Sequence, residues 1–258
     1  MLKGLYTAYT GMINEQHRMD TMTNNLANAT TNGFKKEGAT SQSFDRVLAY
    51  KIKDTSEAGN LSKRLGSMSM GVKIGENYVD YSVGSFKETG NTLDLALSGS
   101  GFFTISFTNK AGETSVKYTR DGNFTMNTQG YLMTQEGDYV LNDSGRTIRL
   151  DPNETITIDR FGDIYQDGAY VDTIGITDFE NYDYLERYGE NYFQPVQGAR
   201  TTEADTNVYS GYLEMSNISV VTEMVNMITI QRQYEANQKV ITTYDSTLDN
   251  AVNQTGRL

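Results

Sequence analysis

A row of closely spaced acidic side chains is the first candidate for chemistry in this sequence: Asp159, Asp163, Asp167 and Asp172. Aspartate oxygens bind calcium when several of them converge from one loop. Here residues 160–162 interrupt the row, residues 164–165 predict a strand, and the spacing does not match an EF-hand. Aspartates at hairpin turns explain the row better, so we expect no metal site.

The other chemically capable residues give no stronger signal. His17 is the single histidine, so a metal bound to it would need carboxylates from distant parts of the chain. Cysteine is absent, so no disulfide or thiolate is available. Gly99-Ser100-Gly101 runs into two phenylalanines, which predict a strand and not the helix that a dinucleotide-binding loop requires. The 33 acidic residues offer many carboxylate pairs, and abundance does not identify a catalytic one. We therefore expect no enzyme activity and no cofactor.

Charge is unevenly distributed along the 258 residues. The net charge is −11, yet residues 1–36 carry four basic and two acidic side chains, and residues 217–258 carry three basic and four acidic. The middle is therefore strongly acidic and the ends are nearly neutral. An acidic surface repels phosphate backbones, so we expect no nucleic-acid partner.

Residues 1–20 mix apolar and polar side chains, and no apolar stretch in the sequence is long enough for a membrane span. We therefore expect neither a cleaved signal peptide nor a transmembrane segment.

Both ends of the chain carry an apolar side chain at every seventh position. The N-terminal row is Leu5, Met12, Met19 and Leu26, and the C-terminal row is Val220, Met227, Tyr234, Ile241 and Leu248. A strict seven-residue apolar repeat is typical of a helix whose seam faces another helix. We predict helices over about residues 3–29 and 220–252 that pair as a coiled-coil layer, and we call these nine residues the assembly seam.

The centre of the chain alternates apolar and polar side chains between glycines. The clearest part is residues 122–150, where Gly130, Gly137 and Gly145 separate short alternating segments and predict a meander of hairpins. Further strands are predicted near residues 93–97, 102–107, 155–159, 163–166, 170–177 and 208–215. The predicted fold class is α+β, with terminal α-helices and a central all-β domain of short antiparallel strands.

Three regions follow from these patterns. Residues 1–33 and 217–258 form the predicted terminal helical assembly domain, and residues 76–216 form the central β domain. Residues 34–75 lack a clear period and predict an extended connector, with a short helix near 41–52.

Two terminal helices could pair within one monomer as an ordinary helical hairpin. Apolar side chains also lie off the seam, however, on both helices: Tyr6, Ile13, Val221, Val225 and Ile228. A two-helix hairpin would leave these side chains in water, so the pattern favours further helices from neighbouring copies.

Several segments resemble the signatures of bacterial flagellar rod and hook proteins. They are Asn24-Asn25-Leu26-Ala27-Asn28 with Gly33-Phe34, Gly101-Phe102-Phe103, Tyr118 to Phe124 with Arg120 and Gly122, Gly211-Tyr212-Leu213-Glu214, and Glu223-Met224-Val225-Asn226-Met227. These segments occur in the family's order and cover both ends and much of the middle. Within the family, the length and the C-terminal signature resemble the distal rod proteins most, and the proximal rod and hook paralogues are near neighbours.

The resemblance implies a structural subunit whose terminal helices form an inner coiled-coil tube and whose β-domain forms an outer layer. It implies export through the flagellar type III apparatus, homo-oligomeric assembly with other rod and hook subunits, and torque transmission from motor to hook. Two alternatives of other classes remain at this point. A deep pocket with two convergent carboxylates would favour a secreted β-domain hydrolase, and an exposed tyrosine platform would favour a secreted binding module.

Overall fold

The structure is a computed structural model that describes residues 2–44, 46–51, 63–110, 112–189 and 191–255. The chain divides into two compact units. Met1–Ala27, Glu37–Asp80 and Ser219–Leu258 form one, called here the helical unit. Asn28–Lys36 and Tyr81–Ile218 form the other, called the β unit. The predicted N-terminal helix, β-rich centre and C-terminal helix are confirmed.

The helical unit contains two long helices and a strand ribbon. Helix α1 spans Leu2–Ala27, helix α2 spans Val220–Asn250, and a short π-helical turn, η2, covers Ala251–Thr255. The strands are β1 (Lys36–Ser43), β2 (Val47–Lys51), β3 (Lys63–Met68) and β4 (Val72–Asp80). Strand β1 pairs with β4, and β2 pairs antiparallel with β3.

The short helix predicted near residues 41–52 is wrong over the part that the structure describes. Residues 41–43 end β1, and Val47–Lys51 is strand β2. Val47 is paired with Met68 and Lys51 with Lys63, so partners far along the chain decide the local conformation. Strand formation depends on the presence of a cross-strand partner more than on intrinsic preference. Residues 45 and 52 of the predicted helix lie outside the described residues.

The β unit is built from short antiparallel strands. Its strands are β5 (Phe86–Glu88), β6 (Leu95–Gly99), β7 (Phe102–Thr108), β8 (Thr114–Thr119), β9 (Phe124–Met126), β10 (Leu132–Thr134), β11 (Tyr139–Val140), β12 (Ile156–Ile158), β13 (Asp163–Gln166), β14 (Ala169–Thr173), β15 (Ile176–Phe179), β16 (Leu185–Tyr188), β17 (Tyr192–Pro195), β18 (Thr201–Glu203), β19 (Thr206–Ser210) and β20 (Tyr212–Glu214), with a 3₁₀ turn, η1, at Tyr182–Tyr184. The meander predicted over residues 122–150 contains the antiparallel pairs β9–β10 and β10–β11.

The largest sheet runs in the order β16-β17-β8-β7-β11-β10-β9, and β15 joins it through β7. Smaller sheets are β12-β13-β14, β19-β6 and β20-β5. Strand β7 shows why the unit has two apolar layers: successive side chains point to opposite faces, and Phe102 and Phe103 are both buried. The strand is therefore covered on both sides.

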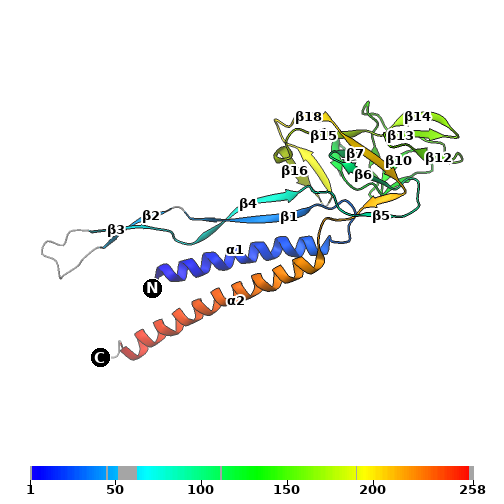
Figure 1. Ribbon diagram of the computed structural model, residues 1–258. Helices are drawn as coiled ribbons and strands as arrows, with labels where there is room; N and C mark the ends of the chain where they lie inside the picture. Colours follow the sequence, from blue (N-terminus) through cyan, green and yellow to red (C-terminus); the bar gives the residue numbers. More distant parts are fainter. Residues whose placement is uncertain (1, 45, 52–62, 111, 190, 256–258) are drawn as a thin grey trace. The chain divides into compact units, whose positions relative to one another are not determined.

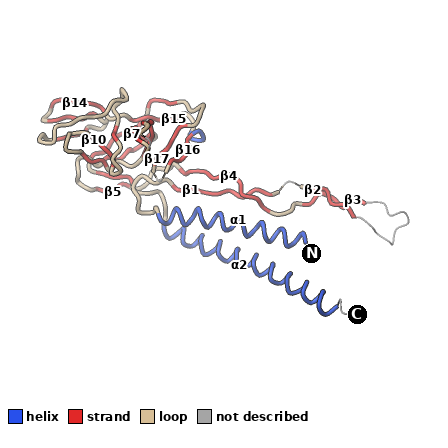
Figure 2. The backbone as a smooth tube through the Cα atoms, turned by 180° about the vertical axis from the view of Figure 1, so that it is seen from behind, coloured by secondary structure: helices blue, strands red, loops and turns tan. Residues whose placement is uncertain are grey.

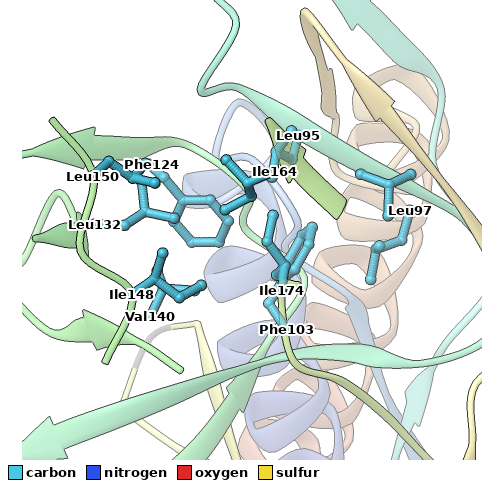
Figure 3. Close-up of a cluster of buried hydrophobic side chains, with 11 residues drawn as sticks. Leu95, Leu97, Phe103, Phe124, Leu132, Val140, Ile148, Leu150, Ile164 and Ile174 are labelled. Atoms are coloured by element: carbon cyan, nitrogen blue, oxygen red, sulfur yellow. The ribbon is translucent and has the colours of Figure 1, made fainter. Parts of the chain in front are cut away.

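The main core lies on the Phe103 side of β7 (Figure 3). Its buried members are Leu95, Leu97, Phe103, Phe124, Leu132, Val140, Ile148, Leu150, Ile164, Ile174 and Val208. On the other side, Phe102 packs within 5.2 Å of Phe193 and 6.2 Å of Phe179, measured between ring centroids. Residues from β6 to β19 thus contribute to the main core, and a second apolar layer packs around Phe102. Burial of these apolar side chains is the main stabilising term for the unit.

Gly33 occupies a position in the β unit that no other residue type fits. Its φ is +66°, and a β carbon there would lie 2.5 Å from the backbone carbon of Arg120 and 2.5 Å from the backbone nitrogen of Asp121. Gly90 has a similar φ of +74° but open space around it. An alanine at Gly90 would therefore meet only the cost of the left-handed backbone, whereas an alanine at Gly33 would meet that cost and a steric clash with the Arg120 backbone as well.

We predict that Gly33→Ala lowers the free energy of unfolding of the β unit by about 2–5 kcal/mol, because a left-handed alanine and an overpacked contact add together. Gly90→Ala should lower it by only about 1–2 kcal/mol, the cost of the left-handed conformation alone. Urea unfolding followed by tyrosine fluorescence measures both. Equal losses in the two variants would show that the contact with the Arg120 backbone is unimportant.

Candidate functional site

Helices α1 and α2 run antiparallel and lie side by side (Figures 1 and 2). A β carbon at Gly4 would meet Tyr244, and one at Gly11 would meet Asn237. Seven residues forward on α1 therefore correspond to seven residues back on α2. The two glycines let polar and aromatic side chains of α2 come close to the α1 backbone.

The assembly seam divides into two groups in the structure. Leu5, Met12, Met19, Leu26, Met227, Tyr234 and Ile241 are half-buried. Val220 and Leu248 are 42% and 41% exposed. Continuing the antiparallel register places both beyond the ends of α1, so no α1 residue faces them. Their exposure follows from the shorter length of α1, which the seven-residue period alone cannot reveal.

Exposed apolar side chains follow one face of each helix, and we call these faces the apolar stripes. On α1 the stripe consists of Tyr6, Tyr9 and Ile13. On α2 it consists of Val221, Met224, Val225 and Ile228, which are exposed by 73%, 51%, 58% and 51%. With about 3.6 residues per turn, the α2 stripe lies roughly opposite Tyr234 and Ile241. The side chains expected off the seam are therefore exposed in the isolated chain.

A second face of α1 meets strand β1 through polar contacts. The Asn25 amide donates to the Glu37 carbonyl at 2.7 Å and accepts from the Glu37 N–H at 2.9 Å. Asn14 and Ser41 exchange hydrogen bonds of 2.9 and 3.1 Å. Asn25 is 1% exposed and Asn14 is 4% exposed. This explains Asn25 of the family signature: its amide substitutes for a strand partner.

A cluster of charged side chains is buried within the β unit. The Lys35 ammonium lies 2.5 Å from Glu214 Oε1, and the Arg120 guanidinium lies 3.3 Å from Glu214 Oε2. The side chains of Lys35 and Glu214 are each 1% exposed, and that of Arg120 is 3% exposed. We call Lys35, Arg120 and Glu214 the buried charge cluster.

Backbone groups supply further partners to the cluster. Glu214 Oε1 accepts from the Gly84 N–H at 2.9 Å, and Lys35 donates to the Ser82 carbonyl at 2.9 Å. Arg120 donates to the carbonyls of Gly99 at 2.6 Å and Leu97 at 3.3 Å. A buried ion pair needs good geometry and further hydrogen bonds to offset the loss of water. Both Glu214 oxygens, the Lys35 ammonium and the two terminal nitrogens of Arg120 have such bonds, whereas the buried Arg120 Nε has no partner among the described residues.

Most of the predicted family-signature residues lie inside the molecule. Those that are buried are Asn25, Gly33, Phe34, Gly101, Phe102, Phe103, Arg120, Gly122, Phe124 and Glu223. Those that are half-buried or exposed are Asn24, Leu26, Ala27, Asn28, Met224, Val225, Asn226 and Met227. The signature therefore combines interior packing with one exposed helical face.

Lys35 and Glu214 were not predicted as site residues, although both lie within or beside the signature segments. A single lysine and a single glutamate 179 positions apart carry no pairing signal. The one available hint is that each sits beside a buried apolar residue, Phe34 or Leu213.

The row of aspartates serves turns and strand ends. Asp167 has a φ of 47° and accepts from the Thr155 hydroxyl at 2.7 Å, while Asp172 accepts from the Asn142 amide at 3.1 Å. Within the described ranges, no three His, Asp or Glu side chains gather in a way that could hold a metal ion. Over the same ranges, neither helix carries an apolar stretch sufficient to cross a membrane.

Asp121, next to Arg120, lines a small pocket of about 310 Å³ with Glu136, Asn191 and Tyr192. Burial raises the pKa of Asp121 to about 6, and Glu136 and Asp94 add to the rise. The Asn123 N–H donates to the carboxylate at 3.0 Å and opposes the shift. Burial also raises the pKa of Tyr192, whose hydroxyl donates to Asp138 at 2.8 Å.

Three family models match the chain. They are described as flagella basal body rod protein (residues 5–35), flagellar hook protein FlgE/F/G D1 domain (residues 96–166) and flagellar basal body rod FlgEFG protein C-terminal (residues 209–254). The first and last include the seam, most of α1 and all of α2, and the middle one covers nearly all of β6 to β13.

Similar proteins align over nearly their whole length. The flagellar basal-body rod protein FlgG of Bacillus subtilis is 34% identical, over 98% of this chain and 99% of its own. The basal-body rod protein FlgF of Mesorhizobium japonicum is 32% identical over 99% of each chain. The hook-basal body complex protein FlhO of Bacillus subtilis is 31% identical over all of both chains.

The chain therefore belongs to the flagellar basal-body rod protein family. It is a structural subunit of the flagellar rod, and rod proteins of this family are exported components of the flagellar basal body. The family is not known as enzymatic. Neither the hydrolase nor the binding-module alternative is favoured.

We predict that Asp121 makes the β unit less stable as the pH rises. Its folded pKa of about 6 exceeds the ordinary value of 3.8, so the folded state holds the proton more tightly. This contribution is present at low pH and is lost as the pH rises through about 6. Between about pH 4 and pH 7 the wild type should lose about 2–3 kcal/mol of unfolding free energy more than Asp121→Asn does.

The measurement is urea unfolding across that pH range. The exposed Asp143 provides a matched control, and Asp143→Asn should follow the wild type within about 0.5 kcal/mol. Parallel pH curves for the wild type and Asp121→Asn would refute the assignment to Asp121.

Proposed function

We propose that this rod subunit self-assembles through its terminal helices into a helical tube. In this proposal the assembly seam and the apolar stripes meet helices of neighbouring copies as a coiled-coil layer, and the β unit forms the outer layer. The tube belongs to the distal part of the rod and transmits torque from motor to hook. Its partners are copies of itself, other rod and hook subunits, and the flagellar type III apparatus that exports it.

The observation that carries this proposal is the α2 stripe. Four apolar side chains there are each more than half exposed, within two turns of one helix. From Val220 to Gln231 the single charged side chain is Glu223, and it is fully buried. A contiguous uncharged apolar surface of this kind is typical of an interaction site. Burying this surface against other helices removes apolar area from water, which stabilises the assembly by about 25 cal/mol per Å² of area buried.

The antiparallel contact of α1 and α2 supports the choice of neighbouring copies as the occupants. Each helix already contacts the other through one of its faces, so the two helices of one subunit can enter the assembly as a preformed pair. An amphipathic helix gains most of its stability from packing. The overhanging Val220 and Leu248 continue the seam past α1, where a neighbour's helix can cover them.

The first test is Val225→Asp on the exposed stripe. Val225 is 58% exposed in the single chain, so the change should leave the melting temperature of the dilute protein unaltered. In the polymer the carboxylate would be buried without a partner, which costs several kcal/mol. We therefore predict loss of sedimentable rods in concentrated protein, as seen by ultracentrifugation and negative-stain microscopy.

Gln238→Asp is the matched control, because it places the same charge at an exposed position of α2 off the stripe. It should form rods like the wild type. Rods formed by Val225→Asp would remove the stripe from the interface. Loss of rods in both variants would show a general sensitivity to charge.

The second test is Ile241→Asp on the seam. Ile241 is half-buried in the helical unit, so the change should lower helix stability, by about 1–3 kcal/mol, and prevent rod formation. The β unit should melt as before. Circular dichroism follows the helices, and hydrogen exchange in the core strands β6, β7 and β10 follows the β unit.

The neighbouring exposed Thr242 gives the control Thr242→Asp, which should retain helix stability. Normal rods from Ile241→Asp would exclude the seam as an assembly element. A lower melting temperature of the β unit would contradict the two-layer organisation.

A further inference from the structure

Two segments far apart in the sequence are joined inside the β unit. The Gly33 N–H donates to the Glu214 carbonyl at 2.7 Å, and the Lys36 N–H donates to the Asn217 side chain at 2.8 Å. Along the chain, Asn28–Lys36 follows directly on α1, and residues 215–219 lead directly into α2. The points where the chain leaves for its two helices are therefore fixed side by side on the β unit.

The buried charge cluster lies at this junction and contributes directional bonds. Glu214 uses one oxygen for Lys35 and the Gly84 N–H and the other for Arg120. Lys35 comes from the first segment, Glu214 from the second, and Arg120 from the end of β8. The free energy needed to remove two charges from water offsets much of the electrostatic attraction between them, so a buried ion pair adds little to stability. Its strict geometry makes it a good choice for fixing position.

We propose that the buried charge cluster is a positioning device for assembly: Lys35, Glu214 and Arg120 fix where the chain segments of both terminal helices leave the β unit. The inference rests on the proposed function, because position matters here only if the helices assemble. Without the cluster the β unit keeps its apolar core, and the first segment keeps its backbone contacts but is held less firmly. Copies that differ in this segment present their helices irregularly, and an ordered polymer requires identical copies.

The central experiment uses the full chain with Lys35→Met. Methionine is flexible and fills a similar space, and Glu214 keeps Arg120 and the Gly84 N–H. Tyrosine fluorescence should still show cooperative melting of the β unit. Hydrogen exchange should accelerate at residues 28–36, and the amount of sedimentable rod should fall at least about tenfold, the effect of weakening each contact by about 1.4 kcal/mol.

Lys117→Met is the matched control. Lys117 is also a buried lysine of the β unit, at 4% exposure. It bonds to Gln194 of β17 and lies 3.9 Å from the centre of the Tyr188 ring of β16, so these contacts are with strands and not with either chain exit. Lys117→Met should lower the melting temperature to a similar degree but leave rod formation and exchange at residues 28–36 at wild-type levels. A further variant, Lys35→Arg, keeps a cationic donor and should form more rods than Lys35→Met.

The outcomes separate the two proposals. Failure of the wild type to form rods overturns the proposed function. Wild-type rods together with normal rods from Lys35→Met overturn the positioning role, as does equal loss of rods in Lys35→Met and Lys117→Met. If Lys35→Met does not melt cooperatively, Lys35→Gln replaces it, with the same expected loss of rods and the same contradiction if rods form.

Discussion

Glu214 holds a carboxylate out of water, and this is possible because Lys35, Arg120 and the Gly84 N–H reach it from three parts of the chain. A buried charge without such partners would be strongly destabilising. The glutamate can be buried only when residues 28–36, the end of β8 and residues 212–214 have all reached their places. The order of the β unit at the chain exits therefore depends on this contact.

The helical unit obeys a different constraint. Its helices contact each other on one face, while Val221, Val225 and Ile228 leave a second face in water. Burial of apolar surface is the main source of helix stability in proteins. A chain with this much exposed apolar helix surface is poorly suited to remain single at high concentration. The β unit, with its acidic surface and closed core, has no such requirement.

Structural features that depend on residues close together in the sequence could be predicted from it. The seven-residue rows predicted α1 and α2, and the alternation around Gly130 and Gly137 predicted the strands β9 to β11. Features that depend on distant partners were not readable. Strand β2 forms because Val47 pairs with Met68 in β3. Val220 is exposed because α1 ends at Ala27. Nothing in the sequence around Lys35 indicates that Glu214 is its partner.

Hydrogen exchange on the same protein, dilute and assembled, tests most directly the claim that the helices are assembly elements on a self-sufficient β unit. We predict slow exchange in the core strands β6, β7 and β10 in both states. We also predict fast exchange in residues 221–228 of the dilute chain and strong protection of these residues in rods. Full protection of α1 and α2 at high dilution would contradict it, because the helices would then have a complete partner within one molecule.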